Sequence, residues 1–497
     1  MSEEKKRAST LEHVLKYTGV FGGVQGLTIL MSIVRTKLGT SILGPAGVAL
    51  MGIYLSITEF VRSTTNFGIP FSSVRRMSEL FESGSDAEQR RFVLVVRTGM
   101  LWVAALAAVI CLAGAPLLAH FFFKDEESLY ARDIALLAPM LVALSITAGE
   151  ISILKGMRRL KRVASISALG AVSTLLLTVP FFWTMGSAGI ILALNVSTIA
   201  MTIIHLAFTL PLYPWRVALF SAYVFREGWQ LVRVGIPYVV AAIAGSGMTM
   251  TLLAMLKRSG TQEDVGFYSM GYNLMVTYAG IVYATFEADY FPRLSSVHHD
   301  RHRRNLTINQ QIRACLLLIS PLLIALMTAM PLVIRLLSSE AFLPAAGMAI
   351  CASFYMFLRG ITTPISYTAL ACGDSRLYLL MEIIYDGASL ALIVGCFHLW
   401  GITGTGIGLS LSALFDLLLI GGIYGRHYRV RIAAATWRLA LTQALLVGAT
   451  LVACMVLPEV WCYAVGLPLL ALSLWRSYKI LNAETTYIQK IRQRLHL

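Results

Sequence analysis

Long apolar stretches recur along almost the whole chain, and short polar segments separate each one from the next. A helix needs about 20 mostly apolar residues to cross a bilayer. The pattern therefore predicts an all-α polytopic membrane protein with about fourteen transmembrane helices. We expect these helices over residues 14–34, 44–67, 92–118, 133–154, 164–184, 188–210, 231–255, 266–289, 314–336, 343–366, 377–399, 403–424, 437–457 and 459–475.

Composition supports this interpretation and excludes a sizeable soluble domain. The 497 residues are 57% hydrophobic and only 13% charged, with a mean hydropathy of +0.72. A soluble protein this apolar lacks the polar surface needed to cover its core. The first apolar stretch is too long for the core of a signal peptide, so we interpret it as a retained anchor.

The net charge of +15 is concentrated in particular loops. Basic residues gather at the N-terminus, after the even-numbered predicted helices and in the C-terminal tail, whereas loops after odd-numbered helices carry few. This distribution is typical of the positive-inside rule and predicts that both termini are cytoplasmic. Attraction to anionic lipid headgroups is a second use of these charges, and nucleic acid is disfavoured as a partner.

Glycine-rich motifs recur at a nearly constant spacing in the two halves of the chain. A shift near 217 residues brings Gly156 beside Gly373 and Gly186 beside Gly401. Such matches can arise by chance in apolar sequences, but their common order favours two homologous six-helix lobes around a central cavity, as in parallel-repeat transporters. The predicted organisation is an N-terminal lobe (1–212), an interfacial linker (213–230), a C-terminal lobe (231–425), and two additional helices with a basic tail (426–497).

An ordered set of loop motifs resembles the Wzx-type polysaccharide flippases of the multidrug/oligosaccharidyl-lipid/polysaccharide (MOP) exporter superfamily. The likeness covers roughly residues 10–425 and is close to the branch that contains the lipid III (enterobacterial common antigen) translocase. The two helices beyond the usual twelve depart from many relatives, and the positions that face the glycan have no visible match. The motifs lie at 37–47, 154–158, 263–268, 291–295 and 375–382.

The resemblance implies a lipid-linked oligosaccharide flippase of the bacterial inner membrane. Its substrate would be an undecaprenyl-pyrophosphate-linked oligosaccharide, which would move from the cytoplasmic to the periplasmic leaflet. Membrane lipids and the polysaccharide polymerase and chain-length machinery are the other partners that it implies. No ATP hydrolysis and no cofactor are expected, and the sequence contains no G-x-x-x-x-G-K-[ST] loop.

Charged residues inside apolar stretches are candidates for a substrate cavity, because a charge at bilayer depth usually faces a cavity or a partner. Glu59, Arg62 and Asn66 share one helical face, and Glu59 and Arg62 can also form a simple i,i+3 pair. Arg359 has no carboxylate nearby in its own helix; it can bind phosphate or pair with Asp386 or Asp416. Basic residues at helix ends complete the set, although topology alone also explains several of them: Arg35, Lys37, Lys155, Arg158, Lys257 and Arg293.

Acidic residues in apolar stretches are candidates for proton or cation coupling. Glu382 and Asp386 lie four residues apart on one helical face, where like charges raise one pKa. Pairing with arginines such as Arg359 is an equally good interpretation. The remaining acidic candidates are Glu150, Glu287, Asp289 and Asp416.

The seven cysteines are scattered, mostly within apolar stretches. No C-x-x-C pair and no Cys/His ligand spacing occurs, so the sequence predicts neither a disulfide framework nor a metal site.

Three other functions are compatible with part of this pattern. A membrane glycosyltransferase or polysaccharide polymerase is disfavoured, because the predicted outer loops are too short to carry a catalytic centre. A drug or cation antiporter of the MOP superfamily is less favoured, because the cationic cavity candidates suit an anionic substrate. A lipid II flippase is a near neighbour that fourteen helices would also suit.

Overall fold

The computed structural model describes residues 2–124 and 127–494, with side chains described for most positions between 26 and 482. All regular secondary structure in this part of the chain is helical, which confirms the all-α prediction. The chain forms two compact units, Met1–Ala254 and Met255–Leu497. Each unit is described by itself below.

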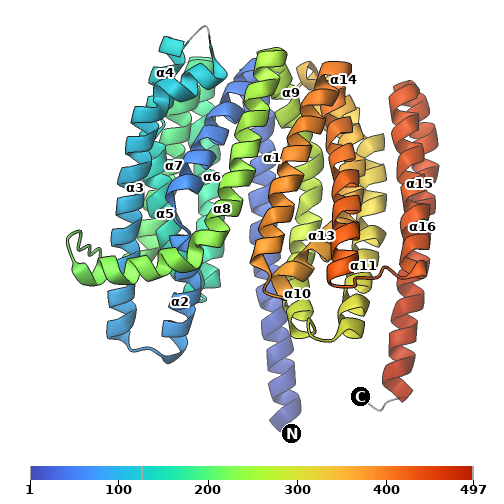
Figure 1. The fold of residues 1–497 in the computed structure, drawn as a ribbon, viewed down its shortest axis with the longest axis horizontal. Helices are drawn as coiled ribbons and strands as arrows, with labels where there is room; N and C mark the ends of the chain where they lie inside the picture. Colours follow the sequence, from blue (N-terminus) through green and yellow to red (C-terminus); the bar gives the residue numbers. More distant parts are fainter. Residues whose placement is uncertain (1, 125–126, 495–497) are drawn as a thin grey trace. The chain divides into compact units, whose positions relative to one another are not determined.

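The N-terminal unit is a bundle of long helices (Figure 1). Its helices are α1 (Ser2–Thr65), α2 (Ile69–Ser83), α3 (Asp86–Phe122), α4 (Glu127–Ala135), α5 (Ala138–Gly156), α6 (Leu160–Met185), α7 (Ile190–Thr209) and most of α8 (Ala222–Ser259).

The C-terminal unit contains the remaining helices. They are α9 (Gln262–Tyr272), α10 (Tyr278–Ser296), α11 (Arg301–Thr328), α12 (Met330–Leu337), α13 (Ala345–Ala371), α14 (Ser375–His427), α15 (Ala434–Val456) and α16 (Glu459–Arg494).

Within the described residues, ten helices are long and apolar enough to cross a membrane, whereas the sequence predicts fourteen. Three of the ten candidates contain two predicted helices each, because helix continues through the predicted loop between them: Gly26–Thr65, Lys161–Thr209 and Ser375–His427.

The predicted helix 266–289 is not among the ten candidates. Here the chain forms α9, then a π-helical segment (Asn273–Thr277), and then α10. Neither α9 nor α10 alone reaches the length and hydropathy of the candidate spans. A π-helical turn interrupts the regular hydrogen-bond ladder and often marks a functional position.

A single glycine lets α14 reverse its direction. Gly401 has φ 58° and ψ −144°, a conformation that residues with a Cβ rarely adopt. Beyond this bend, Gly404 and Gly408 lie directly against the backbone of Cys396 and Ile393. The two limbs of α14 are therefore antiparallel and closely packed, and Figure 1 shows the reversal.

The N-terminal unit contains the same turn between α6 and α7. Gly186 has φ 57° and ψ −133°, and Gly189 lies against the Phe181 carbonyl as Gly404 lies against that of Cys396. Helix α1 bends at a third glycine of positive φ, Gly44 (φ 64°), and also turns back in Figure 1.

The two units match in register at a spacing of 215 residues, close to the shift near 217 predicted from the sequence. Helices α5 and α13 end at Gly156 and Ala371, and α6 and α14 begin at Leu160 and Ser375. The turn between each pair contains one residue of positive φ. It is Arg158 (φ 53°) in the first unit and Gly373 (φ 78°) in the second. Gly373 therefore corresponds to Arg158 rather than to Gly156.

The start of α8 packs on the N-terminal unit. In Figure 1 it runs across the bundle before the helix turns along it. Val224 and Leu231 join a buried apolar cluster with residues of α2, α3 and α5, and the Ser72 hydroxyl donates a hydrogen bond to the Leu231 carbonyl at 2.9 Å. These contacts hold the region predicted as an interfacial linker against the bundle.

The segment that joins α14 to α15 is held by two asparagines of α11. The Asn309 amide donates to the Arg431 carbonyl at 2.9 Å, and its oxygen accepts from the Ala433 N–H at 2.7 Å. Asn305 donates to the Arg429 carbonyl at 3.3 Å. Because α15 and α16 also pack on α11, the C-terminal hairpin is an integral part of its unit.

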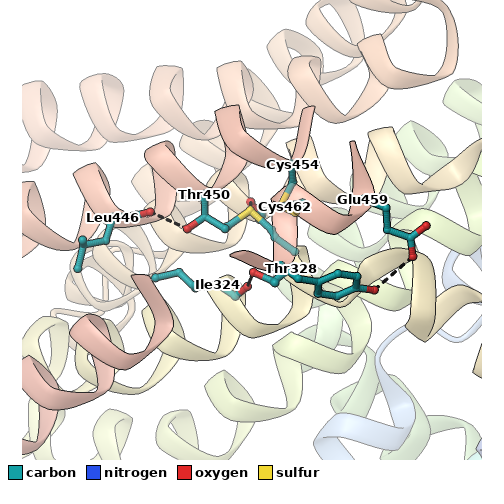
Figure 2. Close-up of a disulfide and its surroundings, with 10 residues drawn as sticks. Ile324, Thr328, Leu446, Thr450, Cys454, Glu459 and Cys462 are labelled. Atoms are coloured by element: carbon teal, nitrogen blue, oxygen red, sulfur yellow. Dashed lines mark hydrogen bonds between the residues drawn. A yellow bond between two sulfur atoms is a disulfide. The ribbon is translucent and has the colours of Figure 1, made fainter. Parts of the chain in front are cut away.

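A disulfide closes the other end of this hairpin, which corrects the prediction that no disulfide is present. Cys454 near the end of α15 bonds to Cys462 near the start of α16, with their Cα atoms 5.0 Å apart (Figure 2). The two cysteines face each other only because the chain turns between Val456 and Glu459. An eight-residue separation has no recognisable signature in the sequence.

We expect alkylation of the denatured protein to reveal this bond. Without a reductant, iodoacetamide should modify the five free cysteines, and after reduction it should modify all seven. Intact-mass spectrometry counts the adducts. Seven adducts before reduction would contradict the bond, because all cysteines would then be free thiols. The bond also requires that this end of the hairpin has met an oxidising compartment.

The close packing at the α14 bend gives a second prediction. Replacing Gly404 by alanine places a Cβ against the Cys396 carbonyl and should destabilise the protein by about 1–3 kcal/mol. The matched control is Gly395→Ala in the same helix, where an added Cβ meets nothing within 4 Å. Thermal unfolding in detergent should show a lower Tm for G404A alone, and equal Tm values would refute the packing argument.

Candidate functional site

One polar pocket of about 150 Å³ lies inside the C-terminal unit, between α13 and both limbs of α14. Each helix presents one face to it, with residues at intervals of three or four as helical geometry requires. The side chains that line the pocket are Tyr355, Arg359, Thr362, Thr363, Ser366 and Tyr367 from α13, Tyr378, Met381, Glu382 and Tyr385 from the first limb of α14, and Ala413, Asp416, Ile420 and Tyr424 from the second limb.

Arg359 supplies the positive charge of this pocket. Its Nη1 donates a hydrogen bond to the Tyr355 hydroxyl at 2.8 Å, and its side chain is accessible to solvent. Among the described residues no carboxylate lies within 4 Å of it, so the expected ion pair with Asp386 or Asp416 is not formed at that distance. Asp416 shares the pocket with Arg359, whereas Asp386 does not line it.

The balance of charge in the pocket limits what it can bind. Glu382 and Asp416 supply two carboxylates against the single guanidinium of Arg359, and the other polar groups are hydroxyls. With all three groups ionised the pocket is net negative. Such a site attracts a proton or a small cation that oxygen atoms can coordinate, and it repels a diphosphate.

The two carboxylates predicted to act together on α14, Glu382 and Asp386, do not share the pocket. Glu382 faces the pocket, while Asp386, four residues further along, is half-buried outside its lining. The second carboxylate of the pocket is instead Asp416, which the bend at Gly401 returns to the level of Glu382.

In the N-terminal unit, Glu150 has a partner that its sequence neighbourhood does not reveal. Arg97 forms a bidentate contact with it, Nε to Oε1 at 2.7 Å and Nη2 to Oε2 at 3.0 Å. Both side chains are 1% exposed. The Nη1 atom of Arg97 also donates to the carbonyls of Tyr213 and Pro214, each at 2.9 Å. The Glu150 carboxylate, a predicted coupling candidate, is thus compensated within the fold.

Glu59 and Arg62 form the i,i+3 pair that their spacing predicts. Arg62 Nε lies 2.9 Å from Glu59 Oε2, and the two side chains are 35% and 51% exposed for Arg62 and Glu59 respectively. Asn66, predicted on the same face, is buried, and its oxygen accepts from the Gly68 N–H at 2.7 Å. Asn66 therefore shapes the turn between α1 and α2.

Three of the other basic candidates lie at or next to helix ends, as predicted. Arg293 pairs with Asp289 at 3.1 Å, and the Lys257 ammonium donates to the Gln262 side chain at 2.9 Å. Arg158 forms an ion pair with Glu82.

Three further basic candidates lie in the N-terminal unit. Arg35 is exposed and Lys37 half-buried, and both lie inside α1 rather than at the predicted helix end, because helix continues to the bend at Gly44. Lys155 is exposed near the end of α5. The side chain of Glu287, an acidic candidate, lies outside the described residues.

Sequence reasoning missed the aromatic lining of the pocket. Five tyrosines surround Arg359, Glu382 and Asp416. A signal for them was present, because Tyr378 and Tyr385 lie on the same helical face as Glu382, four residues before it and three residues after it.

Two ion pairs of the N-terminal unit, Arg97–Glu150 and Arg62–Glu59, should respond differently to mutation. Glu150→Gln leaves the buried Arg97 without a counter-charge and should cost about 3–5 kcal/mol of stability. Glu59→Gln, in an exposed pair, should cost about 0–1 kcal/mol. Fluorescence-detected size-exclusion chromatography after a temperature series measures both; similar thermal profiles would show that the buried pair is not needed for folding.

The fold is shared with transporters of known structure. An inward closed form of the lipid II flippase MurJ aligns over 94% of this chain and 99% of its own, with a TM-score of 0.65 and 15% identity. An inward-facing multidrug resistance MATE family transporter of the MOP superfamily aligns over 83% and 96%, with a TM-score of 0.67 and 15% identity. A MOP superfamily transporter from Pyrococcus furiosus aligns over 88% and 94%, with a TM-score of 0.52 and 12% identity.

No curated protein matches the sequence. The structural likenesses, all at low identity, establish a MOP-like fold and a multi-pass membrane protein, as the ten candidate spans also indicate. A family model described as "Polysaccharide biosynthesis protein" matches residues 14–298, more than half of the chain. The chain therefore belongs to the polysaccharide biosynthesis protein family.

Proposed function

We propose that the protein is a flippase that moves an undecaprenyl-pyrophosphate-linked oligosaccharide from the cytoplasmic to the periplasmic leaflet of the bacterial inner membrane. The observation that carries this proposal is the combination of the family with the fold. The sequence belongs to a family of polysaccharide biosynthesis, while the fold is that of transporters, including one that flips a lipid-linked sugar, lipid II.

In this proposal the bent helices α1, α6–α7 and α14 each cross the membrane twice, which brings the number of crossings close to the predicted fourteen. The distribution of basic loops supports a topology with both termini in the cytoplasm. The matching turns at Gly186 and Gly401 support two lobes of common origin. The cargo would be exposed alternately to the two faces of the membrane, with its polyprenyl tail remaining in lipid.

We assign the pocket around Arg359 to energy coupling and not to the diphosphate of the cargo. Its excess of carboxylate suits a proton or a small cation, and Glu382 and Asp416 are the groups that would hold it. The exposed pair of Glu59 and Arg62 remains a candidate cargo contact in the N-terminal unit.

A drug or cation antiporter is the second candidate, since a multidrug transporter has the same fold and a net-negative pocket also suits a cationic substrate. A lipid II flippase is a third. The composition of accumulated lipids separates these candidates from the first.

The deciding experiment is lipid analysis of a deletion strain. The proposal predicts accumulation of a complete undecaprenyl-pyrophosphate oligosaccharide that is protected from a glycan-modifying enzyme confined to the periplasm. Mass spectrometry would then identify the sugar. A lipid-linked glycan that is absent, incomplete or already accessible in the periplasm would refute the proposal, and accumulated lipid II would select the third candidate.

Complementation of that strain tests the candidate residues. Arg62→Ala should lower surface glycan about tenfold or more, as expected when a charge-assisted contact to the cargo is lost. Arg359→Ala should lower it by a similar factor, because the coupling pocket then loses the guanidinium that offsets Glu382 and Asp416. The amount of folded protein should stay unchanged in both variants. Arg376→Ala is the control, because Arg376 is exposed on α14 and does not line the pocket. Wild-type glycan levels in both test variants would remove these residues from the site.

A further inference from the structure

A second pocket, in the N-terminal unit, is rich in arginine. It has a volume of about 160 Å³ and lies between the first turns of α3 and the segment that joins α7 to α8. The residues that line it are Arg90, Arg91, Val93, Leu94, Arg97, Tyr213, Pro214 and Arg216.

The wall of this pocket is rigidly built. Arg97 is fully engaged with Glu150 and with the carbonyls of Tyr213 and Pro214, and its guanidinium lies 5.1 Å from the centre of the Trp215 ring. The ion pair therefore fixes the backbone of the joining segment immediately before Arg216.

Two further hydrogen bonds hold the same segment on α3. The Tyr213 hydroxyl donates to Gln89 at 2.7 Å, and the Ala218 N–H donates to the Thr98 hydroxyl at 3.1 Å. Arg216 lies between these two attachment points, so its backbone is held beside the first turns of α3.

The arginines at the mouth of the pocket have no direct ion-pair partner among the described residues, although the Glu88 carboxylate acts on Arg91 from a distance. Arg90, Arg91 and Arg216 are exposed, and among the described residues none of them has a carboxylate within 4 Å. The adjacent arginines of α2 differ in this respect, because Arg75 and Arg76 both pair with Glu79. Three arginines around one small pocket present the charge and the forked donors that suit an anion with several oxygen atoms.

The surroundings indicate that this anion belongs to a lipid. The joining segment and the start of α8 expose large apolar and aromatic side chains, including Trp215 (40%), Phe220 (95%), Phe225 (77%) and Trp229 (54%). Exposed aromatic residues of this kind occur at the level of lipid headgroups, and amphipathic segments lie in that interface.

We propose that the arginine pocket formed by Arg90, Arg91, Arg97 and Arg216 binds the phosphate or diphosphate headgroup of an anionic lipid. On the topology proposed above, this site faces the cytoplasmic leaflet. A carrier-lipid diphosphate and a bulk anionic phospholipid present the same chemistry to it. The proposal does not depend on the identity of the cargo, and binding can be measured without transport.

The test is native mass spectrometry of the purified full-length protein titrated with defined lipids. The probes are undecaprenyl pyrophosphate, phosphatidylglycerol, phosphatidylcholine and inorganic pyrophosphate. The test variant is the double substitution Arg90→Ala/Arg91→Ala. A second protein carries Arg216→Ala in addition to these two substitutions. The matched control is Arg75→Ala/Arg76→Ala, which removes the same charge from paired arginines of the same unit. Arg90→Lys/Arg91→Lys retains the charge but loses the forked geometry.

Both anionic lipids should bind the wild type more tightly than phosphatidylcholine, and the test variant should weaken their binding about tenfold or more. The control should change it less than about twofold, and the lysine variant should lie in between. Preference for undecaprenyl pyrophosphate identifies the carrier as the source, and equal binding identifies bulk phospholipid. An equal loss in the control, unchanged binding in the test variant, or binding of free pyrophosphate as tight as that of the lipids would overturn the proposal.

Discussion

The structure depends on reversing long helices without leaving backbone polar groups unpaired. A chain inside a bilayer has no water to satisfy its N–H and C=O groups, so tight turns with few unpaired groups are favoured. Glycines of positive φ at positions 44, 186 and 401 allow such turns. The turn at 401 has a chemical consequence, since it folds the second limb of α14 back on the first and places Asp416 in the same pocket as Glu382.

The two units treat charged side chains between their helices in opposite ways. In the N-terminal unit Arg97 and Glu150 neutralise each other completely and use their remaining donors to attach a neighbouring segment. In the C-terminal unit Arg359 donates a hydrogen bond to the Tyr355 hydroxyl. Two carboxylates line the same pocket without direct contact to Arg359. A compensated pair resists change, whereas a pocket with separated charges can respond to a proton or a cation.

Helical periodicity and hydropathy were sufficient to predict the all-α fold, and the glycine motifs identified two of the turns. The number of spans was predicted less well, because helix runs through Gly44 and Gly401 and because a π-helical turn interrupts residues 266–289. Arg359, Glu382 and Asp416 were recognised as candidates by their charge. That they share one pocket was not predictable, since it requires the tertiary reversal of α14. The Arg97–Glu150 pair and the disulfide also join residues whose proximity exists only in the folded chain.

The attachment of the last two helices has a practical consequence. Asn305 and Asn309 hold the start of the hairpin to α11, and the disulfide between Cys454 and Cys462 closes its far end. The hairpin is therefore coupled mechanically to the C-terminal unit. If the protein works by the proposed alternating access, a fluorophore placed on α15 would report the displacement of that unit, and a second one on α3 would supply the reference point against which the displacement is read.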